Sequence, residues 1–393
     1  MKSAGFINLP DWKHRLQEIL TGFGREDTVK LPVLGRENAE SPWMTLDASD
    51  FFAAVQTGIH FSASNNIRRF PENVVTTDAE LAINRLLEGR QHQTFFSAAM
   101  GGTFPFQRIL GSAYATVRPD KIIVQNDSVT GFILSRMEKE GKNLEQALHE
   151  AQWEKLVGGN PSQHLHGMVA RNRLILQMAA IFGVLLRPDQ VPTIGINSLV
   201  VDDIRIAGEL GYSVKLLGIG QYHGGVVKAL VEPCMIPERY LLAQVRGGSE
   251  MIYAKTLEGL SQVYTCPGSS PESQVRGILT DLYEPCPSIA GDLLPAEKIE
   301  SFADHFYLRF NIVNMTDTLA GLLQMFSRNS IEIEKIHQPA VAVSRETVDN
   351  AGYTLVLLTG KVSRGSLEKT LNQISSQIKL AGLKSCFRFI RQA

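Results

Sequence analysis

The C-terminal part of the chain, residues 300–393, alternates between apolar runs and amphipathic segments in an order that few folds accommodate. Short apolar runs predict strands, and segments with 3.6-residue periodicity predict helices. In chain order these are the strand Phe306–Val313, the helix Asp317–Phe326, the strands Ile331–His337 and Tyr353–Leu358, the helix Ser366–Ile378 and the strand Cys386–Ile390. This β-α-β-β-α-β order predicts a ferredoxin-like domain.

Residues 106–292 predict a second domain that mixes helices and strands. Lys121–Gln125 is an apolar run typical of a buried strand. Helices are predicted at Phe132–Glu140, Leu144–Leu156, Leu174–Leu186 and Ile204–Gly211, and strands at Ser213–Ile219, Val226–Val231 and Met251–Ala254. The pattern indicates an α+β domain. Leu293–Glu297 is predicted to link this domain to the C-terminal one.

The first 105 residues contain few predicted elements. Strands are expected at Ile59–Ala63 and Gln93–Ala99. Between them, Asp78–Leu87 has helical periodicity, and either Thr77 or Asp78 can cap its N-terminus. These elements amount to only the last strands of a nucleotide-type α/β sheet.

A nicotinamide-binding domain opens with a strand, a G-x-G-x-x-G turn and a helix whose N-terminus receives the pyrophosphate. The nearest match is Gly22-Phe23-Gly24, but Arg25 and Glu26 follow it and no apolar strand precedes it. Two βαβ units of about thirty residues each also need more than the chain offers before the first predicted strands. We therefore expect a truncated nucleotide-binding region at 1–105 and no bound cofactor.

Composition excludes several classes of partner. The formal net charge is -1 and charged residues make up 20% of the chain, so there is no general attraction to nucleic acid or anionic membranes. The four cysteines form no C-x-x-C pair, and we expect free thiols. The N-terminal segment lacks the apolar run of a signal peptide, and no stretch is long enough to span a bilayer. We expect a cytoplasmic protein.

Five collinear segments resemble homoserine dehydrogenase. They are TGIHFSASNN at 57–66, SAAMGGTFP at 97–105, VTGFILSRMEKEGKNLEQALHEAQ at 129–152, IRIAGELGYSVKLLGIG at 204–220 and EPCMIPERYLLAQVRG at 232–247. The C-terminal unit, 300–393, resembles an ACT domain, the amino-acid-sensing module that many of these enzymes carry. The resemblance implies a mixed sheet with helices, the remnant of a Rossmann-type sheet, and a homodimer with two-fold symmetry.

The residues that the family uses for hydride transfer are replaced. Asn66 stands where the resemblance implies the lysine after T-A-N, and Gly158 stands where it implies a substrate-binding glutamate. In the family's D-P-x-x-D-V-x-G-x-D-x-x-x-K segment, Val169 replaces the catalytic aspartate and Arg173 the lysine. The remaining substrate-pocket candidates are Thr130, Asn160 and His164, of which the last two replace the leading carboxylates. No catalytic residue is therefore assigned.

Two further features have functional interpretations. Asn314 and Asp317 lie where ACT domains have D-x-P-G-x-L, so they are candidates for contacting an amino-acid effector, although Asp317 could simply cap its helix. His164 and His166 could suggest a metal pair, but no ligand-type residue stands near them in sequence, and we expect no metal site.

Three functions remain open. The first is a catalytically inactive homoserine dehydrogenase-like protein with a regulatory or amino-acid-binding role. The second is a working NAD(P)-dependent dehydrogenase that interconverts aspartate semialdehyde and homoserine with other residues. The third is an enzyme of another class that uses the same pocket.

Overall fold

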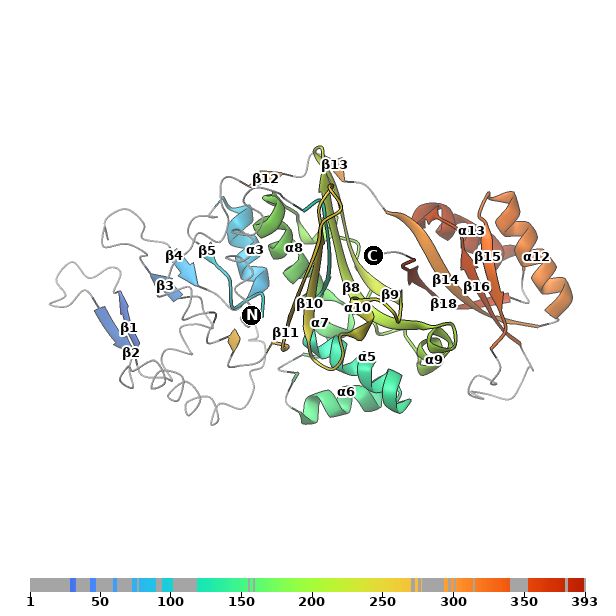
Figure 1. Ribbon diagram of the computed structural model, residues 1–393, viewed down its shortest axis with the longest axis horizontal. Helices are drawn as coiled ribbons and strands as arrows, with labels where there is room; N and C mark the ends of the chain where they lie inside the picture. Colours follow the sequence, from blue (N-terminus) through green and yellow to red (C-terminus); the bar gives the residue numbers. More distant parts are fainter. Residues whose placement is uncertain are drawn as a thin grey trace.

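The structure is a computed structural model that describes part of the chain. The described residues are 29–32, 43–46, 59–61, 73–75, 78–89, 94–101, 119–154, 156–157, 160–269, 273–274, 277, 293–295, 298–299, 302–313, 315–339, 353–378 and 381–391. Within these ranges the chain forms a mixed α/β fold organised by one large sheet (Figure 1). No helix among these residues is long and apolar enough to cross a membrane.

The large sheet has 11 strands, and nine of them follow the order β11-β10-β6-β8-β9-β18-β14-β16-β15. Its first five are β11 (Ser261–Cys266), β10 (Glu250–Lys255), β6 (Lys121–Gln125), β8 (Tyr212–His223) and β9 (Val226–Pro237). Neighbours among these five pair antiparallel. β8 and β9 extend several residues past their apolar runs, because each completes the other's hydrogen-bond ladder over its whole length.

Helices cover one face of this half of the sheet. They are α5 (Ser128–Glu140), α6 (Leu144–Trp153), α7 (Ser162–Leu165), α8 (Met168–Phe182) and α9 (Val201–Glu209). Gly218 and Gly220 on β8 let α8 lie close: a Cβ at Gly218 would stand 2.8 Å from Val124 Cγ2 and 3.3 Å from Leu174 Cδ1. A larger residue at either position would push α8 away from the sheet.

The C-terminal unit has the predicted β-α-β-β-α-β order. Its main elements are β14 (Ala303–Ile312), α12 (Met315–Arg328), β15 (Ile333–His337), β16 (Tyr353–Thr359), α13 (Arg364–Gln377) and β18 (Ala381–Phe389). The unit has its own core, built around residues such as Phe306, Leu308 and Phe326. The assignment of this unit as an ACT domain remains a prediction.

Helix α12 begins earlier than predicted. It starts at Met315, so Asp317 lies inside its first turn and is not its N-cap. The apolar periodicity marks only where a helix has a buried face, whereas the exposed residues before that face also adopt helical geometry.

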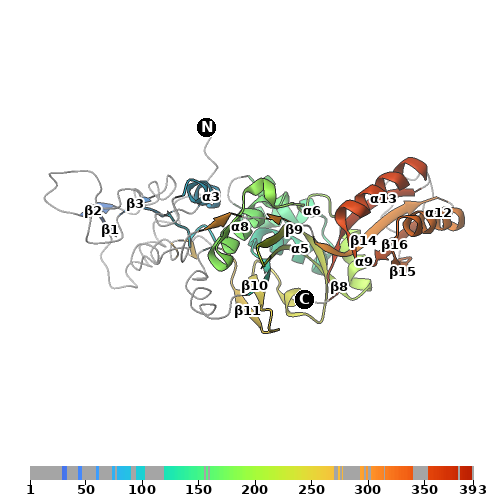
Figure 2. The ribbon, with the colours of Figure 1, turned by 90° about the horizontal axis from the view of Figure 1, so that it is seen from above.

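The two halves of the sheet are joined by a parallel pairing between β18 and β9, with Arg388 opposite Cys234 and Phe389 opposite Met235. Figure 2 shows the two units side by side along the long axis of the molecule. The boundary predicted at the linker Leu293–Glu297 therefore does not divide the sheet into two, because main-chain hydrogen bonds join β18 to β9.

A buried carboxylate strengthens the same junction. Asp203 on α9 is 0% exposed. It accepts hydrogen bonds from Arg309 Nε at 2.7 Å, from the Tyr307 hydroxyl at 3.2 Å and from Ser385 Oγ at 2.6 Å. All three donors belong to β14 and β18, so α9 is fastened to the C-terminal unit.

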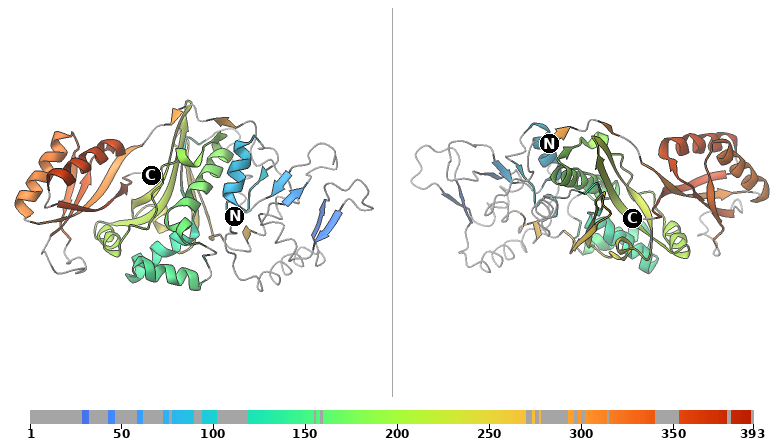
Figure 3. Two further views of the ribbon diagram at one scale, coloured as in Figure 1. Left: turned by 180° about the vertical axis from the view of Figure 1, so that it is seen from behind. Right: turned by 45° about the horizontal axis from the view of Figure 1, so that its top comes forward.

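Little of residues 1–105 is described. Strands β3 (Ile59–Phe61), β4 (Asn73–Val75) and β5 (Thr94–Phe95) form a small sheet, and β1 (Val29–Pro32) pairs with β2 (Trp43–Leu46). Helix α3 (Ala79–Leu87) is capped by Asp78, as predicted, and lies beside α8 (Figure 3). β5 is shorter than the predicted Gln93–Ala99, because the chain turns from residue 97 onward.

The remaining elements are short. They are β7 (Val184–Leu185), η2 (Pro188–Gln190), α10 (Leu241–Gln244), β12 (Leu294–Pro295), β13 (Lys298–Ile299) and β17 (Val362–Ser363). β12 pairs with β7 and β13 pairs with β9, so the predicted linker is partly tied to the middle unit. The apolar spacing of Trp12–Leu20 predicts a short helix, and this segment lies outside the described residues.

Replacing Asp203 should strongly destabilise the protein. Asp203→Ala removes the only carboxylate in this contact and leaves the guanidinium of Arg309, whose side chain is 9% exposed, buried without its partner. Breaking a buried pair in this way typically costs about 3–5 kcal/mol of unfolding free energy. Urea unfolding of the variant, compared with Asp189→Ala at the exposed Arg187–Asp189 pair, measures the effect. Equal stability of the two variants would contradict the role assigned to Asp203.

Candidate functional site

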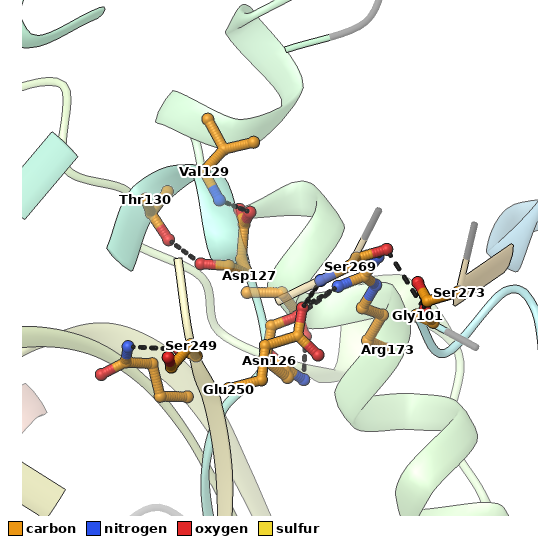
Figure 4. Close-up of polar contacts among 12 residues, drawn as sticks. Gly101, Asn126, Asp127, Val129, Thr130, Arg173, Ser249, Glu250, Ser269 and Ser273 are labelled. Carbon is orange, nitrogen blue, oxygen red and sulfur yellow. Dashed lines mark hydrogen bonds and ion pairs between the residues drawn. The ribbon is translucent and has the colours of Figure 1, made fainter. Parts of the chain in front are cut away.

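Three polar side chains are buried where β6 ends and α5 begins. Gln125, Asn126 and Asp127 are 2%, 3% and 2% exposed. Asp127 caps α5, because its Oδ1 accepts a hydrogen bond from the Val129 N–H at 3.1 Å. The Thr130 hydroxyl donates to the main-chain oxygen of Asp127 at 3.0 Å (Figure 4). A buried polar cluster at the carboxyl end of an otherwise apolar strand is the usual place for a binding or catalytic site.

Asp127 also holds His164. The His164 Nδ1 lies 2.9 Å and 3.1 Å from the two carboxylate oxygens of Asp127. Burial acts to raise the pKa of Asp127, but the nearby His164, Arg173 and the Val129 N–H together lower it below its ordinary value. The ionised carboxylate therefore fixes the orientation of the imidazole, whose side chain remains 18% exposed.

Arg173 on α8 and Glu250 on β10 form a buried ion pair. Arg173 Nη1 lies 2.9 Å from Glu250 Oε1 and also donates to the main-chain oxygen of Asn126 at 2.6 Å. Its Nη2 donates to Ser269 Oγ at 3.2 Å. Figure 4 shows Arg173 directed at this set of protein atoms. Burial raises the pKa of Glu250 to about 7, against the opposing attraction of Arg173.

The loop that follows β11 closes the cluster. Its Gly268 is packed so tightly that a Cβ there would lie 1.8 Å from the main-chain oxygen of Gly248, so only glycine fits. The next residue, Ser269, receives Arg173 and donates weakly to the Gly101 oxygen at 3.4 Å. Ser273 donates to the same oxygen at 2.6 Å. The turn at residue 101 is thereby attached to the middle unit.

The structure brings most of the predicted pocket residues to one end of the sheet. Thr130, His164 and Arg173 all reach the Asp127 region, directly or through Asn126. Asn160 is exposed, and its Oδ1 accepts from the Ser162 N–H at 3.0 Å, one position before Pro161, the N-cap of α7. Val169 is half-buried on the first turn of α8.

Other candidates lie elsewhere. Asp317 lies on α12 in the C-terminal unit. Asn66, Gly158 and Asn314 lie outside the described residues. The two histidines do not converge, because His164 contacts Asp127 and His166 Nδ1 contacts Ser162. Within the described ranges no group of three or more His, Cys, Asp or Glu side chains could hold a metal ion.

Sequence reasoning missed two members of the cluster, Asp127 and Glu250. Each is a charged residue close to the end of an apolar run: Asp127 stands two positions after KIIVQ, and Glu250 directly precedes MIYA. A charge at the end of a buried strand must be paired or solvated, and that rule could have indicated both. Their pairing with His164 and Arg173 depends on the fold.

Comparisons with known proteins agree with this architecture. The family model for homoserine dehydrogenase matches residues 114–283. A homoserine dehydrogenase of Bacillus subtilis is 22% identical over 338 residues, covering 81% of this chain and 77% of that protein. One of Neisseria gonorrhoeae is 25% identical over 283 residues, and the match covers 67% of this chain and 63% of that protein.

A crystal structure of a homoserine dehydrogenase from Thiobacillus denitrificans superposes with a TM-score of 0.71 at 24% identity, covering 81% of this chain and 76% of that one. The likeness shows a shared fold, with the same kind of large mixed sheet. The residues that the family model matches, 114–283, include the whole polar cluster.

The raised pKa of Glu250 predicts a pH-dependent contribution to stability. The folded protein holds this proton up to about pH 7, whereas an unperturbed carboxyl releases it near 4.5, so stability falls as the pH rises from 4.5 toward 7. A shift of this size corresponds to a loss on the order of 3 kcal/mol. Glu250→Gln cannot titrate, so the wild type should lose stability relative to the variant across that window.

Denaturant unfolding of the wild type, Glu250→Gln and the exposed control Glu258→Gln between pH 5 and 8 tests this prediction. The Glu250→Gln variant leaves Arg173 without an anionic partner at every pH. The quantity to compare is therefore how the difference in unfolding free energy between the wild type and this variant changes with pH. A difference that stays constant with pH would show that Glu250 does not titrate in this range.

Proposed function

We propose that this chain is a homoserine dehydrogenase-like protein that does not transfer hydride and has a regulatory or amino-acid-binding role. The observation that carries the proposal is the Arg173–Glu250 pair. At the position where the family resemblance implies a lysine, Arg173 is 7% exposed and its guanidinium is bound to Glu250, Asn126 and Ser269.

The chemistry supports this proposal. Oxidation of homoserine moves a hydride from the alcohol carbon and a proton from the hydroxyl, so a group must accept that proton. A guanidinium is a poor proton acceptor, so Arg173 does not suit this role, and Val169, in place of the aspartate, has no titratable atom. In the polar cluster, the cation is the Arg173 guanidinium, and it stabilises the Glu250 carboxylate and the Asn126 carbonyl oxygen.

The family also implies a nicotinamide cofactor, and the residues present do not fit one. The sequence lacks the glycine-rich phosphate loop, and the described part of residues 1–105 offers no helix N-terminus that follows such a loop. We therefore derive no step through this group.

A regulatory role draws on the C-terminal unit. Asp317 lies in the first turn of α12, where the family resemblance implies contacts with an amino-acid effector. We propose that this unit is an ACT domain and that the protein forms a two-fold symmetric dimer. Multi-angle light scattering at micromolar concentration should give twice the chain mass, and a monomer would contradict the dimer.

A second candidate function, an enzyme that uses the same pocket, is favoured by the Asp127–His164 pair. Because Nδ1 of His164 faces the buried carboxylate, Nε2 is the nitrogen that could exchange a proton with a ligand. Such a pair is the usual arrangement for general acid–base catalysis.

We expect no homoserine-dependent reduction of NAD+ or NADP+ at high protein concentration. Loss of one transition-state donor typically costs about 10²–10³ in rate, and several are replaced here. The triple variant Asn66→Lys, Val169→Asp, Arg173→Lys should also be inactive, because no cofactor loop is restored. The homoserine dehydrogenase of Bacillus subtilis, assayed in parallel, serves as the positive control.

Activity in the wild type would overturn the proposal. The His164→Gln variant then tests which residues transfer the proton. Loss of activity in this variant would support the Asp127–His164 pair as the new proton-transfer group. A thermal-shift screen against aspartate-family amino acids tests the binding role independently, because a ligand of the native state raises the melting temperature.

A further inference from the structure

A cavity lies at the junction between the middle sheet and the C-terminal unit, lined by residues near the start of β14. Figure 1 shows β14 next to β9 and β18 at this junction. Its volume is about 720 Å³, within the usual range for small-molecule sites. The charged residues that line it are Lys121, Lys228, Arg239, Asp304, Lys361 and Arg391. The floor is apolar and includes Ile219, Phe302 and Ile390.

This junction pocket is separate from the Arg173 cluster. Gly218 and Gly220 on β8 face α8, so the intervening Ile219 and the following Gln221 point to the opposite side of the sheet. Because α8 carries Arg173, the two sites lie on opposite faces. Occupancy of the junction pocket can therefore be tested without reference to catalysis, and this inference does not rest on the proposed function.

The charges around the pocket are unbalanced. Five of the lining residues are Lys or Arg, and Asp304 is the one carboxylate among them. Asp304 is already engaged, since its Oδ2 lies 3.0 Å from Arg388 Nη1. Within the part of the chain that the structure describes, Lys121, Arg239 and Lys361 form no ion pair. A concave site lined by one sign of charge concentrates counter-ions.

The Lys121 ammonium group shows how this excess of positive charge affects a single side chain. Burial lowers the pKa of this ammonium, with Asp304 opposing the shift and Lys255 adding to it. A partly buried cation without a contacting anion is unfavourable, and a bound anion would relieve it. The pocket is thus better suited to an anionic occupant than to water alone.

We propose that the junction pocket binds a small organic polyphosphate, the chemical class of nucleoside di- and triphosphates. Lysine ammonium groups act as point charges toward phosphate, and the Arg239 guanidinium can donate two hydrogen bonds in parallel, whereas Arg391 Nη2 already lies 2.9 Å from Glu334 Oε2. The floor of Ile219, Phe302 and Ile390 would carry the apolar or ring portion of the ligand. A single phosphate or carboxylate would match only part of the positive charge of Lys121, Arg239 and Lys361.

The position of the pocket gives such a ligand a means of regulation. Its walls come from β6, β8 and β9 on one side and from β14 and the end of the C-terminal unit on the other. A polyanion that contacts both sides stabilises one relative arrangement of the two units, in proportion to its preference for that arrangement.

Isothermal titration of the full-length chain with ADP, at low salt and without divalent cations, tests the proposal. We expect saturable binding that weakens as NaCl is raised, because screening acts on exposed cations. The double variant Arg239→Glu, Lys361→Glu changes two exposed lining residues and should weaken binding on the order of tenfold or more. Arg328→Glu, Lys369→Glu on the C-terminal helices makes the same change in charge away from the pocket and should leave binding unchanged.

Two further probes separate the parts of the ligand. Adenosine should not bind, and pyrophosphate should bind more weakly than ADP because it cannot use the apolar floor. Equal affinity for pyrophosphate and ADP would overturn the organic part of the proposal. Absence of ADP binding, or binding that survives in Arg239→Glu, Lys361→Glu, would overturn the site itself, including the case in which a second copy of the chain covers the pocket.

Discussion

The arrangement of the two units depends on the buried carboxylate of Asp203. A charge that is 0% exposed is tolerated only where donors replace the lost water, and here Arg309, Tyr307 and Ser385 supply them from two strands of the other unit. The requirement is geometric as well as energetic. These hydrogen bonds favour the arrangement in which α9 lies against β14 and β18 while β18 pairs with β9.

In the polar cluster where β6 ends, packing and polar pairing constrain neighbouring residues in different ways. Gly268 must remain glycine because the main chain of residue 248 lies against it. Arg173, by contrast, is held by polar contacts, because Glu250 and the Asn126 oxygen accept its hydrogen bonds. Constraints from packing and constraints from chemistry therefore act on neighbouring residues independently.

Much of this fold could be predicted from periodicity. Lys121–Gln125 was predicted with its observed bounds, and the C-terminal order of elements was predicted in full, because each element has one buried face. The length of β8 was underestimated because its far end, Gln221–His223, carries polar residues. The length of β9 was underestimated because Glu232 and Pro233 interrupt its apolar run before the buried residues Cys234, Met235 and Ile236.

The candidate site was predicted only in part. His164 and Arg173 were singled out through the family resemblance, but their carboxylate partners stand 37 and 77 positions away in the chain. Contacts at such separations follow from tertiary structure and leave no local pattern.

The continuous sheet has a consequence for how this protein could evolve. Small C-terminal domains are commonly exchanged between proteins as modules when their boundary is a solvated linker. Here the boundary runs between two hydrogen-bonded strands, and one partner of a buried ion pair stands on each side of it. A recombination event that replaced the C-terminal unit would expose the edge of β9 and leave Asp203 without its donors. The two units are therefore expected to evolve as one piece. A substitution on one side of the junction must be compensated by a substitution on the other side.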